Sequence, residues 1–419
     1  MFFEISEKIK NLSSVALEKA KPVFSGINEL TEYNQQKVLS AFIRNRVDET
    51  DFNTTTGYGY SDKGREKLDV LVADIFGTES AIIRAGALAS GTHTLAVCLY
   101  GILRPNDTML CVTGTPYDTL HSTIGLNGKN MGDGTLADFG INYAQVDLTV
   151  NDEIDYDAVE KCASDKSVRM VYIQRSRGYS LRHTISIAEI EKVCEIVHRV
   201  NKRAIVMVDN CYGEFVETRE PTEVGVDVMV GSLIKNAGGG IAPTGAYIVG
   251  KKEVVELVSS RFIAPNIGLD VGSYAGSYTP FFQGCFLAPH TTLNALKGNI
   301  LLGRVAEKLG FVSYPKFGEI PHDLVRTFEL QTEDNLVDFC RMIQRLSPVD
   351  SSVVPYPWDM PGYDDKVIMA AGSFIQGSSI ELSADGPIRE PFLAYLQGGL
   401  TYEHLKIVSI KFAERYLSI

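Results

Sequence analysis

The stretch Val226-Asp-Val-Met-Val-Gly-Ser-Leu-Ile-Lys-Asn-Ala-Gly-Gly-Gly240 decides the fold of this 419-residue chain. A short β-branched run is followed by Gly231 and Ser232, and a single lysine, Lys235, then precedes a cluster of glycines. The run has the length and composition of a buried strand, and the glycines indicate a turn beyond it. Lys235 is therefore predicted to lie directly after a buried strand.

Short apolar runs of the same kind recur through the middle of the chain. They cover residues 81–84, 109–112, 143–146, 170–173, 205–208, 226–230 and 246–249. Helical or loop stretches separate most of these runs, and the clearest helix begins at Ser186, which forms a capping box with Glu189. Continuous apolar strands that alternate with helices indicate a mostly parallel sheet covered on both faces, so the chain is predicted to be an α/β protein.

The sequence predicts three parts. Residues 1–55 are charged and periodic, and they are predicted to form an N-terminal helical arm. Residues 56–290 carry the alternating pattern of a large α/β domain. After about residue 290 the pattern changes, and residues 291–419 are predicted to form a smaller C-terminal α+β domain that begins with a helix over residues 293–309.

Charge and composition exclude several classes of function. The formal net charge of −12 argues against binding to nucleic acid or to an anionic membrane surface. The seven cysteines are scattered and odd in number, which is typical of reduced thiols in a cytoplasmic protein. The chain shows no signal-peptide pattern, no apolar run long enough to span a bilayer and no metal-binding Cys/His spacing. We therefore expect a cytoplasmic protein without a bound metal.

Lys235 has a predicted partner in Asp209, which ends the apolar run over residues 204–208. Pyridoxal phosphate (PLP) needs a lysine that holds its aldehyde as a Schiff base and a carboxylate that keeps its ring nitrogen protonated. Lys235 would supply the first group and Asp209 the second. Burial and a nearby cofactor are expected to lower the pKa of Lys235. Taken alone, Lys235 is more typical of an ordinary loop lysine and Asp209 of a strand-end turn, and it is their combination that indicates a cofactor site.

A predicted helix start offers a phosphate site. Ala89-Ser-Gly-Thr-His-Thr94 opens a helix after a strand, and free backbone N–H groups at such a helix start bind phosphate. Gly91 would allow a close approach, and Ser232 could add a hydroxyl group. Plain capping of the helix by Ser90 explains the same pattern.

Aromatic and basic residues complete the predicted site. Tyr117 follows the next strand and could stack on a flat cofactor, although a tyrosine in a proline turn is the ordinary alternative. Tyr58 and Tyr60 lie in a glycine-rich loop and could donate to phosphate across a subunit boundary. Arg177 and Arg389 are the candidates for binding a substrate carboxylate, which favours a bidentate guanidinium, and each could instead be structural.

Taken together, these segments resemble the fold-type I PLP enzymes of the cystathionine/methionine lyase group. The matching motifs, in order, are Tyr58 to Ser61, Ser90-Gly91, Leu103-Arg-Pro-Asn-Asp107, Tyr117, Val208-Asp-Asn210 and Ser232-x-x-Lys235. The chain is more similar still to the branch called methionine γ-lyase-like or aluminium-resistance proteins. The motifs typical of that branch are Ser90-Gly-Thr-His93, Val112-Thr-Gly-x-Pro-Tyr-Asp-Thr119, Gln283-Gly-x-Phe-x-Ala-Pro-His290 and Tyr395-Leu-Gln-Gly-Gly-Leu-Thr-Tyr402.

The resemblance implies roles for the predicted site residues. Lys235 would be the Schiff-base lysine, Asp209 the partner of the ring nitrogen and Tyr117 the stacking group. The phosphate would be bound by Ser90, Gly91, Thr92 and Ser232. The resemblance also implies a homodimer or homotetramer with shared active sites, in which Tyr58 or Tyr60 reaches the phosphate of a neighbouring subunit. One residue departs from the better-known lyases, because Asp62 stands where they carry a phosphate-binding arginine, with Arg65 nearby.

The function implied by the resemblance is that of a PLP-dependent carbon–sulfur lyase. Lys235 would remove the α-proton of a methionine- or cystathionine-class amino acid, and loss of a thiol would leave a keto acid and ammonia. An aminotransferase or an aldolase on the same fold is the enzymatic alternative. A non-catalytic PLP-binding regulatory protein is the alternative from another class.

Overall fold

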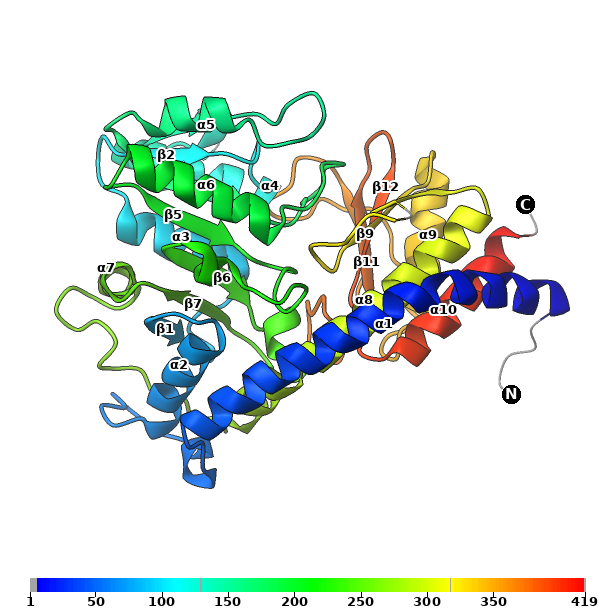
Figure 1. The fold of residues 1–419 in the computed structure, drawn as a ribbon, viewed down its shortest axis with the longest axis horizontal. Helices are drawn as coiled ribbons and strands as arrows, with labels where there is room; N and C mark the ends of the chain where they lie inside the picture. Colours follow the sequence, from blue (N-terminus) through cyan, green and yellow to red (C-terminus); the bar gives the residue numbers. More distant parts are fainter. Residues whose placement is uncertain (1–5, 129, 317, 418–419) are drawn as a thin grey trace.

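The computed structural model describes residues 6–128, 130–316 and 318–417, which form two sheets in two lobes (Figure 1). The seven-stranded sheet has the order β1-β7-β6-β5-β4-β2-β3. Its strands are β1 (Ser80–Ile83), β2 (Thr108–Cys111), β3 (Asn142–Gln145), β4 (Val168–Gln174), β5 (Ile205–Asp209), β6 (Val228–Ser232) and β7 (Ala246–Gly250). Strands β3, β2, β4, β5 and β6 pair in parallel, and β7 pairs antiparallel with β6 and β1. The predicted mostly parallel sheet is confirmed.

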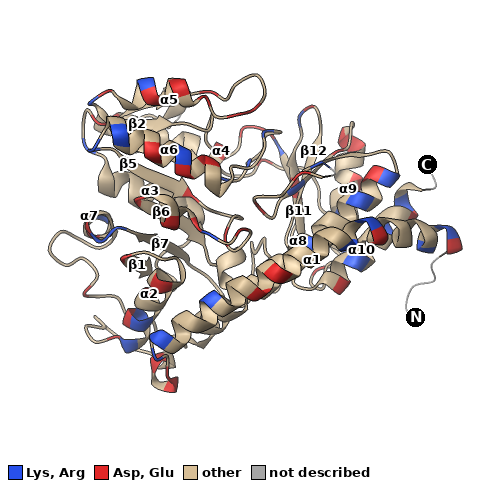
Figure 2. Ribbon diagram, viewed as in Figure 1, with Lys and Arg blue, Asp and Glu red and all other residues tan. Residues whose placement is uncertain are grey.

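Helices cover both faces of the large sheet because its strands are apolar on both sides. Val206 and Val208 of β5 lie in one core, with α2 (Lys63–Ile75), α5 (Tyr156–Ala163) and α6 (Ile187–Val200). Ile205 and Met207 point to the other core, with α3 (Gly91–Ile102) and α7 (Lys252–Phe262). The strands are accordingly almost free of charged residues, which lie mainly on helices and loops (Figure 2). This layering turns the carboxyl ends of the parallel strands toward the second lobe.

The second lobe is built on the antiparallel sheet β10-β11-β12-β9-β8. Its elements are β8 (Val312–Tyr314), β9 (Arg326–Glu329), α9 (Glu333–Arg345), β10 (Val367–Ala370), β11 (Ser383–Pro387), β12 (Leu393–Gln397) and α10 (Tyr402–Tyr416). Phe328, Phe339 and Phe412 are fully buried between the sheet and these helices. These strands and helices lie in the part of the chain for which the smaller C-terminal α+β domain is predicted.

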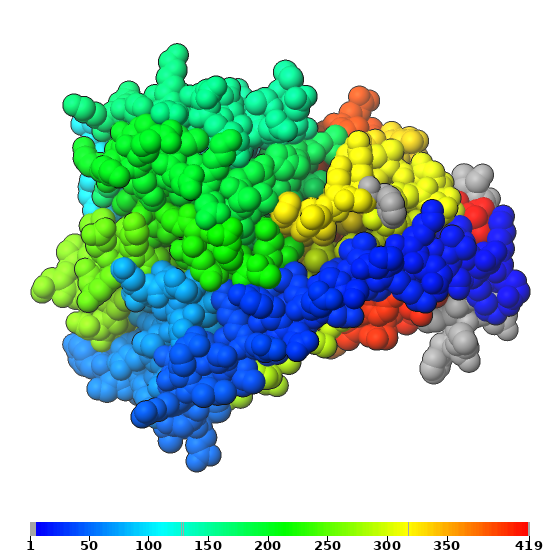
Figure 3. All heavy atoms as spheres, viewed as in Figure 1, coloured from blue at the N-terminus to red at the C-terminus, as the bar shows by residue number. Residues whose placement is uncertain are grey.

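Two long helices join the lobes. Helix α1 (Glu7–Arg44) packs along α8 (Thr279–Lys308) and crosses the surface of both lobes as one ridge (Figure 3). The helix predicted over residues 293–309 begins earlier, at Thr279, and the predicted domain boundary after residue 290 falls inside it. Residues 1–5 of the predicted arm lie outside the described residues.

Short elements complete the described structure. These are α4 (Asp118–Ile124) and the 3-10 helices η1 (Glu49–Phe52), η2 (Leu126–Gly128), η3 (Ala137–Phe139), η4 (Pro221–Val224) and η5 (Asn236–Gly238). Among the described residues, no helix has the length and apolar character needed to cross a membrane.

Candidate active site

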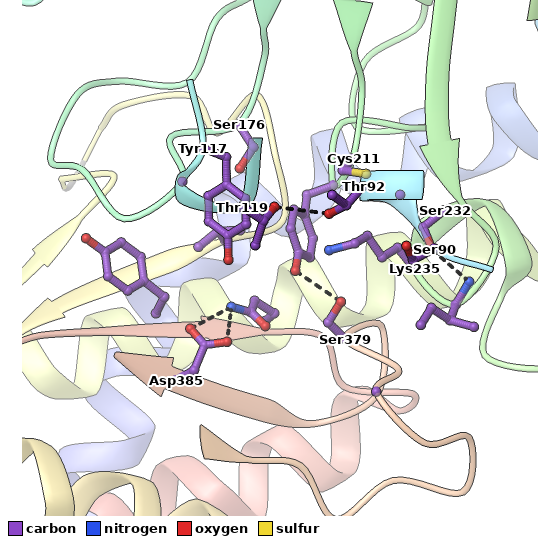
Figure 4. A pocket seen from close by; sticks show the side chains of 18 of the residues that line it. Ser90, Thr92, Tyr117, Thr119, Ser176, Cys211, Ser232, Lys235, Ser379 and Asp385 are labelled. Carbon is purple, nitrogen blue, oxygen red and sulfur yellow. Dashed lines mark hydrogen bonds between the residues drawn. The ribbon is translucent and has the colours of Figure 1, made fainter. Parts of the chain in front are cut away.

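A cavity of about 300 Å³ lies at the carboxyl ends of the parallel strands, between the two lobes. Lys235 contributes to its wall from the large lobe and Asp385 from the small one (Figure 4). Asp209 and Gln397 line the cavity from the same two sides. Open α/β sheets bind ligands at this edge, and the volume is at the low end for ligand pockets. The cavity is therefore the candidate active site.

Asp209 reaches the cavity because it is the last residue of β5, paired in register with Gln174 at the end of β4. Its side chain is buried, and Oδ1 accepts a hydrogen bond from the backbone N–H of Cys211 (3.0 Å). Burial raises the pKa of Asp209, although the Cys211 N–H and nearby Lys235 both oppose that shift. The protonated ring nitrogen of PLP would be a positively charged partner that stabilises the ionised carboxylate.

Lys235 follows the end of β6 by three residues and directly precedes η5 as its N-cap residue. Its Nζ lies 3.7 Å from the centre of the Tyr212 ring. Burial acts against the charge on this amine, but the Tyr212 phenol, the Cys211 thiol and Asp209 together raise the pKa of Lys235 above its usual value. The lowered pKa predicted from burial and a nearby cofactor is not found among these protein groups, because the neighbours outweigh the effect of burial.

The turn after β5 places Tyr212 beneath the lysine at a conformational cost. Tyr212 has a φ of +72°, in the left-handed region that bulky residues seldom adopt. Arg175 holds the turn by donating to Asn210 Oδ1 (2.8 Å) and to the Gly213 carbonyl (2.9 Å). A Cβ atom on Gly213 would lie only 2.5 Å from this guanidinium. Strain of this kind persists only where the surroundings enforce it, and it is common at functional sites.

The start of α3 opens into the same cavity. Ser90 caps the helix by accepting from the backbone N–H of His93 (3.1 Å), so the capping interpretation of Ser90 holds. Ser90, Gly91, Thr92 and Ser232 all line the cavity. The first N–H groups of a helix have no intrahelical acceptor, and a phosphate could accept from them here.

Tyr117 lies directly before α4 and also lines the cavity. Its backbone N–H donates to Gln174 Oε1 (2.6 Å), and its hydroxyl group is hydrogen-bonded to that of Tyr363. Burial, reinforced by Tyr363 and Asp385, raises the pKa of Tyr117 well above its usual value. The phenol therefore keeps its proton at neutral pH.

These groups fit PLP. An amine, a buried carboxylate short of positive charge, a helix N-terminus and an aromatic ring meet in one cavity, and each matches one part of the cofactor. Their individual roles remain predictions, but the structure brings together Lys235, Asp209 and Tyr117 with the four residues of the expected phosphate site.

Known proteins of similar sequence and structure share this architecture. The sequence model of a family described as methionine gamma-lyase matches residues 9–417. The chain belongs to the methionine gamma-lyase family. It is 48% identical to the Bacillus subtilis (strain 168) protein YnbB over 380 residues, which are 91% of this chain and 90% of that protein.

Solved structures extend this comparison. The carbon–sulfur lyase involved in aluminium resistance from Clostridium novyi NT is 47% identical, with a TM-score of 0.93 over 98% of this chain and 96% of that one. The PLP-dependent protein YhfS from Escherichia coli is only 14% identical and has a TM-score of 0.57 over 94% of this chain and 97% of that one, so it shows the fold alone. The methionine gamma-lyase family member described here has fold type I.

Four predicted residues of this family member do not reach the cavity within the single chain. Tyr58 and Tyr60 are exposed and stack on each other, with ring centroids 5.4 Å apart. Arg177 is buried outside the cavity wall and contacts Thr327 Oγ1 (3.4 Å). Arg389 is partly exposed and forms an ion pair (2.8 Å) with an aspartate of its own lobe. The structure therefore does not support direct placement of either arginine in the cavity.

Asp62, which stands where the better-known lyases carry a phosphate-binding arginine, makes contacts within its own chain instead. It caps α2 by accepting from the Arg65 backbone N–H (2.8 Å), and it also accepts from the hydroxyl groups of Tyr278 (2.7 Å) and Thr55. The Arg65 guanidinium donates to the carbonyls of Gly59 and residue 272, at 2.8 Å each. Arg65 thus holds its own loop and does not replace the missing arginine.

Sequence reasoning missed several wall residues. Tyr212 lies three residues after Asp209. It could have been predicted, because residues that follow the end of this strand are expected to lie near the site. Tyr363, Asp385 and Gln397 come from the second lobe, where no pattern indicated which strands face the cavity.

Proposed function

We propose that this chain is a PLP-dependent carbon–sulfur lyase that releases a thiol from a sulfur-containing amino acid of the methionine or cystathionine class, leaving a keto acid and ammonia. The observation that carries the proposal is that Lys235 and Asp209 share one cavity with the start of α3. Membership of the methionine gamma-lyase family supports it, as does the similarity to the Clostridium novyi carbon–sulfur lyase.

Each group of PLP has residues to hold it. Asp209 would keep a proton on the ring nitrogen, and Tyr117 would lie against the ring. The phosphate would accept from the start of α3 and from Ser232. When bound, PLP supplies an aldehyde that joins to amines and a ring that stabilises negative charge at the substrate α-carbon.

Lys235 and Tyr117 would move the protons. Once the substrate amine has taken its place, Lys235 is a free amine positioned to remove the α-proton. The neighbours that raise its pKa would then help Lys235 to hold the proton it has removed. Tyr117 keeps its proton because burial raises its pKa, so it can donate to the departing sulfur. Residues of both lobes enclose this chemistry and limit the access of water.

A visible spectrum recorded during titration with a panel of amino acids tests the proposal. The holoprotein is expected to change its absorbance and to release thiol, keto acid and ammonia with a sulfur amino acid. Lys235→Ala is expected to lose the cofactor absorbance of the lysine adduct and all turnover, whereas the exposed Lys166→Ala retains both. A Lys235→Ala variant that kept both would contradict the proposal.

The same panel separates the alternatives. A keto acid without ammonia or thiol would indicate an aminotransferase. Acetaldehyde from threonine would indicate an aldolase. A yellow protein that forms no product from any amino acid would indicate a PLP-binding protein without this activity.

We also propose that the active sites are shared in a homodimer or homotetramer. The exposure of Tyr58 and Tyr60, on a loop that Arg65 holds in place, supports this, because two stacked exposed tyrosines are suited to a contact with another chain. Light scattering of the holoprotein gives the oligomeric state. Tyr58→Ala and Tyr60→Ala are expected to weaken PLP binding; unchanged binding in both would contradict a shared site.

A further inference from the structure

The wall of the cavity that faces away from the large sheet carries an unbalanced charge. Asp385, in β11, is buried and lines the cavity, and both of its carboxylate oxygens accept from Gln397 Nε2 at 3.3 Å. Within residues 6–128, 130–316 and 318–417, no lysine, arginine or histidine forms an ion pair with it. An amide is a weak partner for a buried carboxylate, which is stabilised far better by an opposite charge.

Apart from Lys235, no described residue of the cavity wall can supply that opposite charge. Lys235 is the only basic residue among the described residues that line the cavity, and Asp209 and Asp385 are the two acidic ones. The proposed chemistry uses Lys235 for the aldehyde and Asp209 for the ring nitrogen. Burial raises the pKa of Asp385 to about 6, against the opposing effects of Gln397, Tyr179 and Lys235. Asp385 is therefore mostly ionised at neutral pH, and once Lys235 is used for the aldehyde no other described residue of the wall offers it a cation.

Tyrosine rings surround the same part of the cavity. Tyr179 lies 5.0 Å from Tyr395 and 5.6 Å from Tyr363 between ring centroids, and Tyr117 lies 5.7 Å from Tyr179. The buried hydroxyl group of Tyr395 has no hydrogen-bond partner in the described part of the chain. An ammonium group has three N–H donors, and aromatic faces attract cations. The Asp385 carboxylate, the unpaired Tyr395 hydroxyl group and the surrounding rings are therefore together suited to bind an ammonium group.

We propose that Asp385 and this tyrosine cluster bind a cationic amine at the end of the substrate remote from its α-carbon. The substrate is then a sulfur amino acid whose sulfur carries a chain that ends in an ammonium group. The α-amine cannot be the group recognised, because it must reach the position of Lys235. A neutral chain such as that of methionine would bury Asp385 without a partner. This inference rests on the proposed function and narrows its substrate class.

Two synthetic substrates of equal size test the inference. S-(2-aminoethyl)-L-cysteine ends in an ammonium at pH 8, and S-propyl-L-cysteine ends in a methyl group at the same place. The same pair built on homocysteine covers elimination at the γ-carbon. We measure kcat/KM for thiol release with the holoenzyme, using whichever pair the enzyme cleaves. The aminoethyl compound is expected to give a value at least about tenfold higher than the propyl compound, because charged hydrogen bonds in a buried site contribute on this scale.

Asp385→Asn removes the charge but keeps the shape. It is expected to lower kcat/KM for the amine by about ten- to a hundredfold, mainly through KM, and to leave the propyl compound within about threefold. Asp385→Glu, which retains the charge, is expected to keep part of the preference. The exposed Asp157→Asn in α5 is the matched control and should leave both values unchanged.

The outcomes separate this inference from the proposed function. Equal cleavage of the amine and propyl compounds by the wild type would overturn the inference while the lyase proposal stands, and this comparison requires no variant to fold. An equal loss for both compounds in Asp385→Asn would also overturn it. A visible spectral change with the amine compounds alone, without thiol release, would support the inference and contradict the lyase. No spectral change with any compound would contradict both.

Discussion

The amine nitrogen of Lys235 lies 3.7 Å from the centre of the Tyr212 ring, and the Tyr212 hydroxyl donates to Ser379 Oγ (3.1 Å) in the other lobe. The ring face favours the charged form of the lysine. The residue that sets the protonation of Lys235 is thus also a direct link between the lobes. Movement of the small lobe would act on the lysine through this side chain and through the hydrogen bond from the Ser379 N–H to the Ile234 carbonyl (3.2 Å).

Tyr212→Phe is expected to lower the pKa of Lys235 while the ring stays in place. The phenol is the neighbour that raises this pKa most, and a lysine reacts with an aldehyde only as a neutral amine. Uptake of PLP by the apoprotein should become roughly three- to tenfold faster at pH 8, because a larger fraction of the amine is neutral. Absorbance measured from pH 7 to 10 gives the profile. Tyr33→Phe, on the exposed face of α1, should match the wild type.

Glu214 is expected to make the protein less stable as the pH rises. Its Oε1 accepts from the Tyr247 hydroxyl (2.7 Å), Oε2 has no partner among the described residues, and burial raises its pKa from 4.5 to about 8. The folded protein therefore binds this proton more tightly than the unfolded chain. The resulting stabilisation is complete below pH 4.5 and is lost between pH 4.5 and 8, up to roughly 5 kcal/mol.

Glu214→Gln should remove this part of the pH dependence. The denaturation midpoint of the variant is expected to rise relative to that of the wild type from pH 5 to pH 8. The difference in midpoint between the variant and the wild type reports the titration of Glu214. The pKa of Glu214 is also influenced by its neighbour Glu220 and by nearby Lys235, and both are present in the two proteins. The exposed Glu195→Gln should give a constant difference. A constant difference for Glu214→Gln as well would show that the carboxyl group is not protonated in the folded protein.

Gly231→Ala is expected to destabilise the strand that leads to Lys235. A Cβ atom there would lie 2.4 Å from both Glu214 Oε1 and the Tyr247 hydroxyl oxygen, which are buried and cannot move freely. Overpacking of this kind costs about 1–3 kcal/mol, measured as a lower denaturation midpoint. Gly26→Ala, in α1, meets no atom within 4 Å and should be neutral or slightly stabilising. Equal midpoints for the two variants would refute the packing argument.

Asp62→Ala is expected to cost about 2–3 kcal/mol of stability, since it removes a helix cap and leaves the buried Tyr278 hydroxyl without its acceptor. Asp155→Ala removes a cap alone, that of α5, and should cost about 1 kcal/mol. Chemical denaturation measures both.

Asp62→Arg installs the residue of related lyases in a buried position, so it should also destabilise and should not tighten PLP binding. A stable Asp62→Arg with tighter PLP binding would assign the position to the phosphate site.

The large sheet could be predicted because short apolar runs in the sequence, separated by helical stretches, determine where its strands lie. Each run of four or more apolar residues between helices became a strand, with ends shifted by one or two residues. The start of α8 could not be predicted, because residues 284–290 combine glycine with a proline that usually interrupts a helix. Contact with α1 and the other elements packed on α8 keeps this segment helical.

The site was predictable only where it lies on that sheet. Asp209 and Ser232 end two neighbouring parallel strands and Lys235 follows the second, so the shared edge of the sheet brings them together. Asp385 and Tyr363 depend on how one lobe docks on the other, which no local pattern encodes. Arg389 was a reasonable candidate by residue type, but its partner in its own lobe holds it outside the cavity.

The walls of the cavity come from two sheets with separate cores, and this gives the fold a route to new selectivity. A substitution on β11 or β12 alters the side that faces the outer end of a substrate, without moving the strands that carry Asp209 and Lys235. Descendants of one ancestral chain could thus exchange one substrate for another while they keep the same chemistry. For an engineer, the hairpin of β11 and β12 is the segment to randomise.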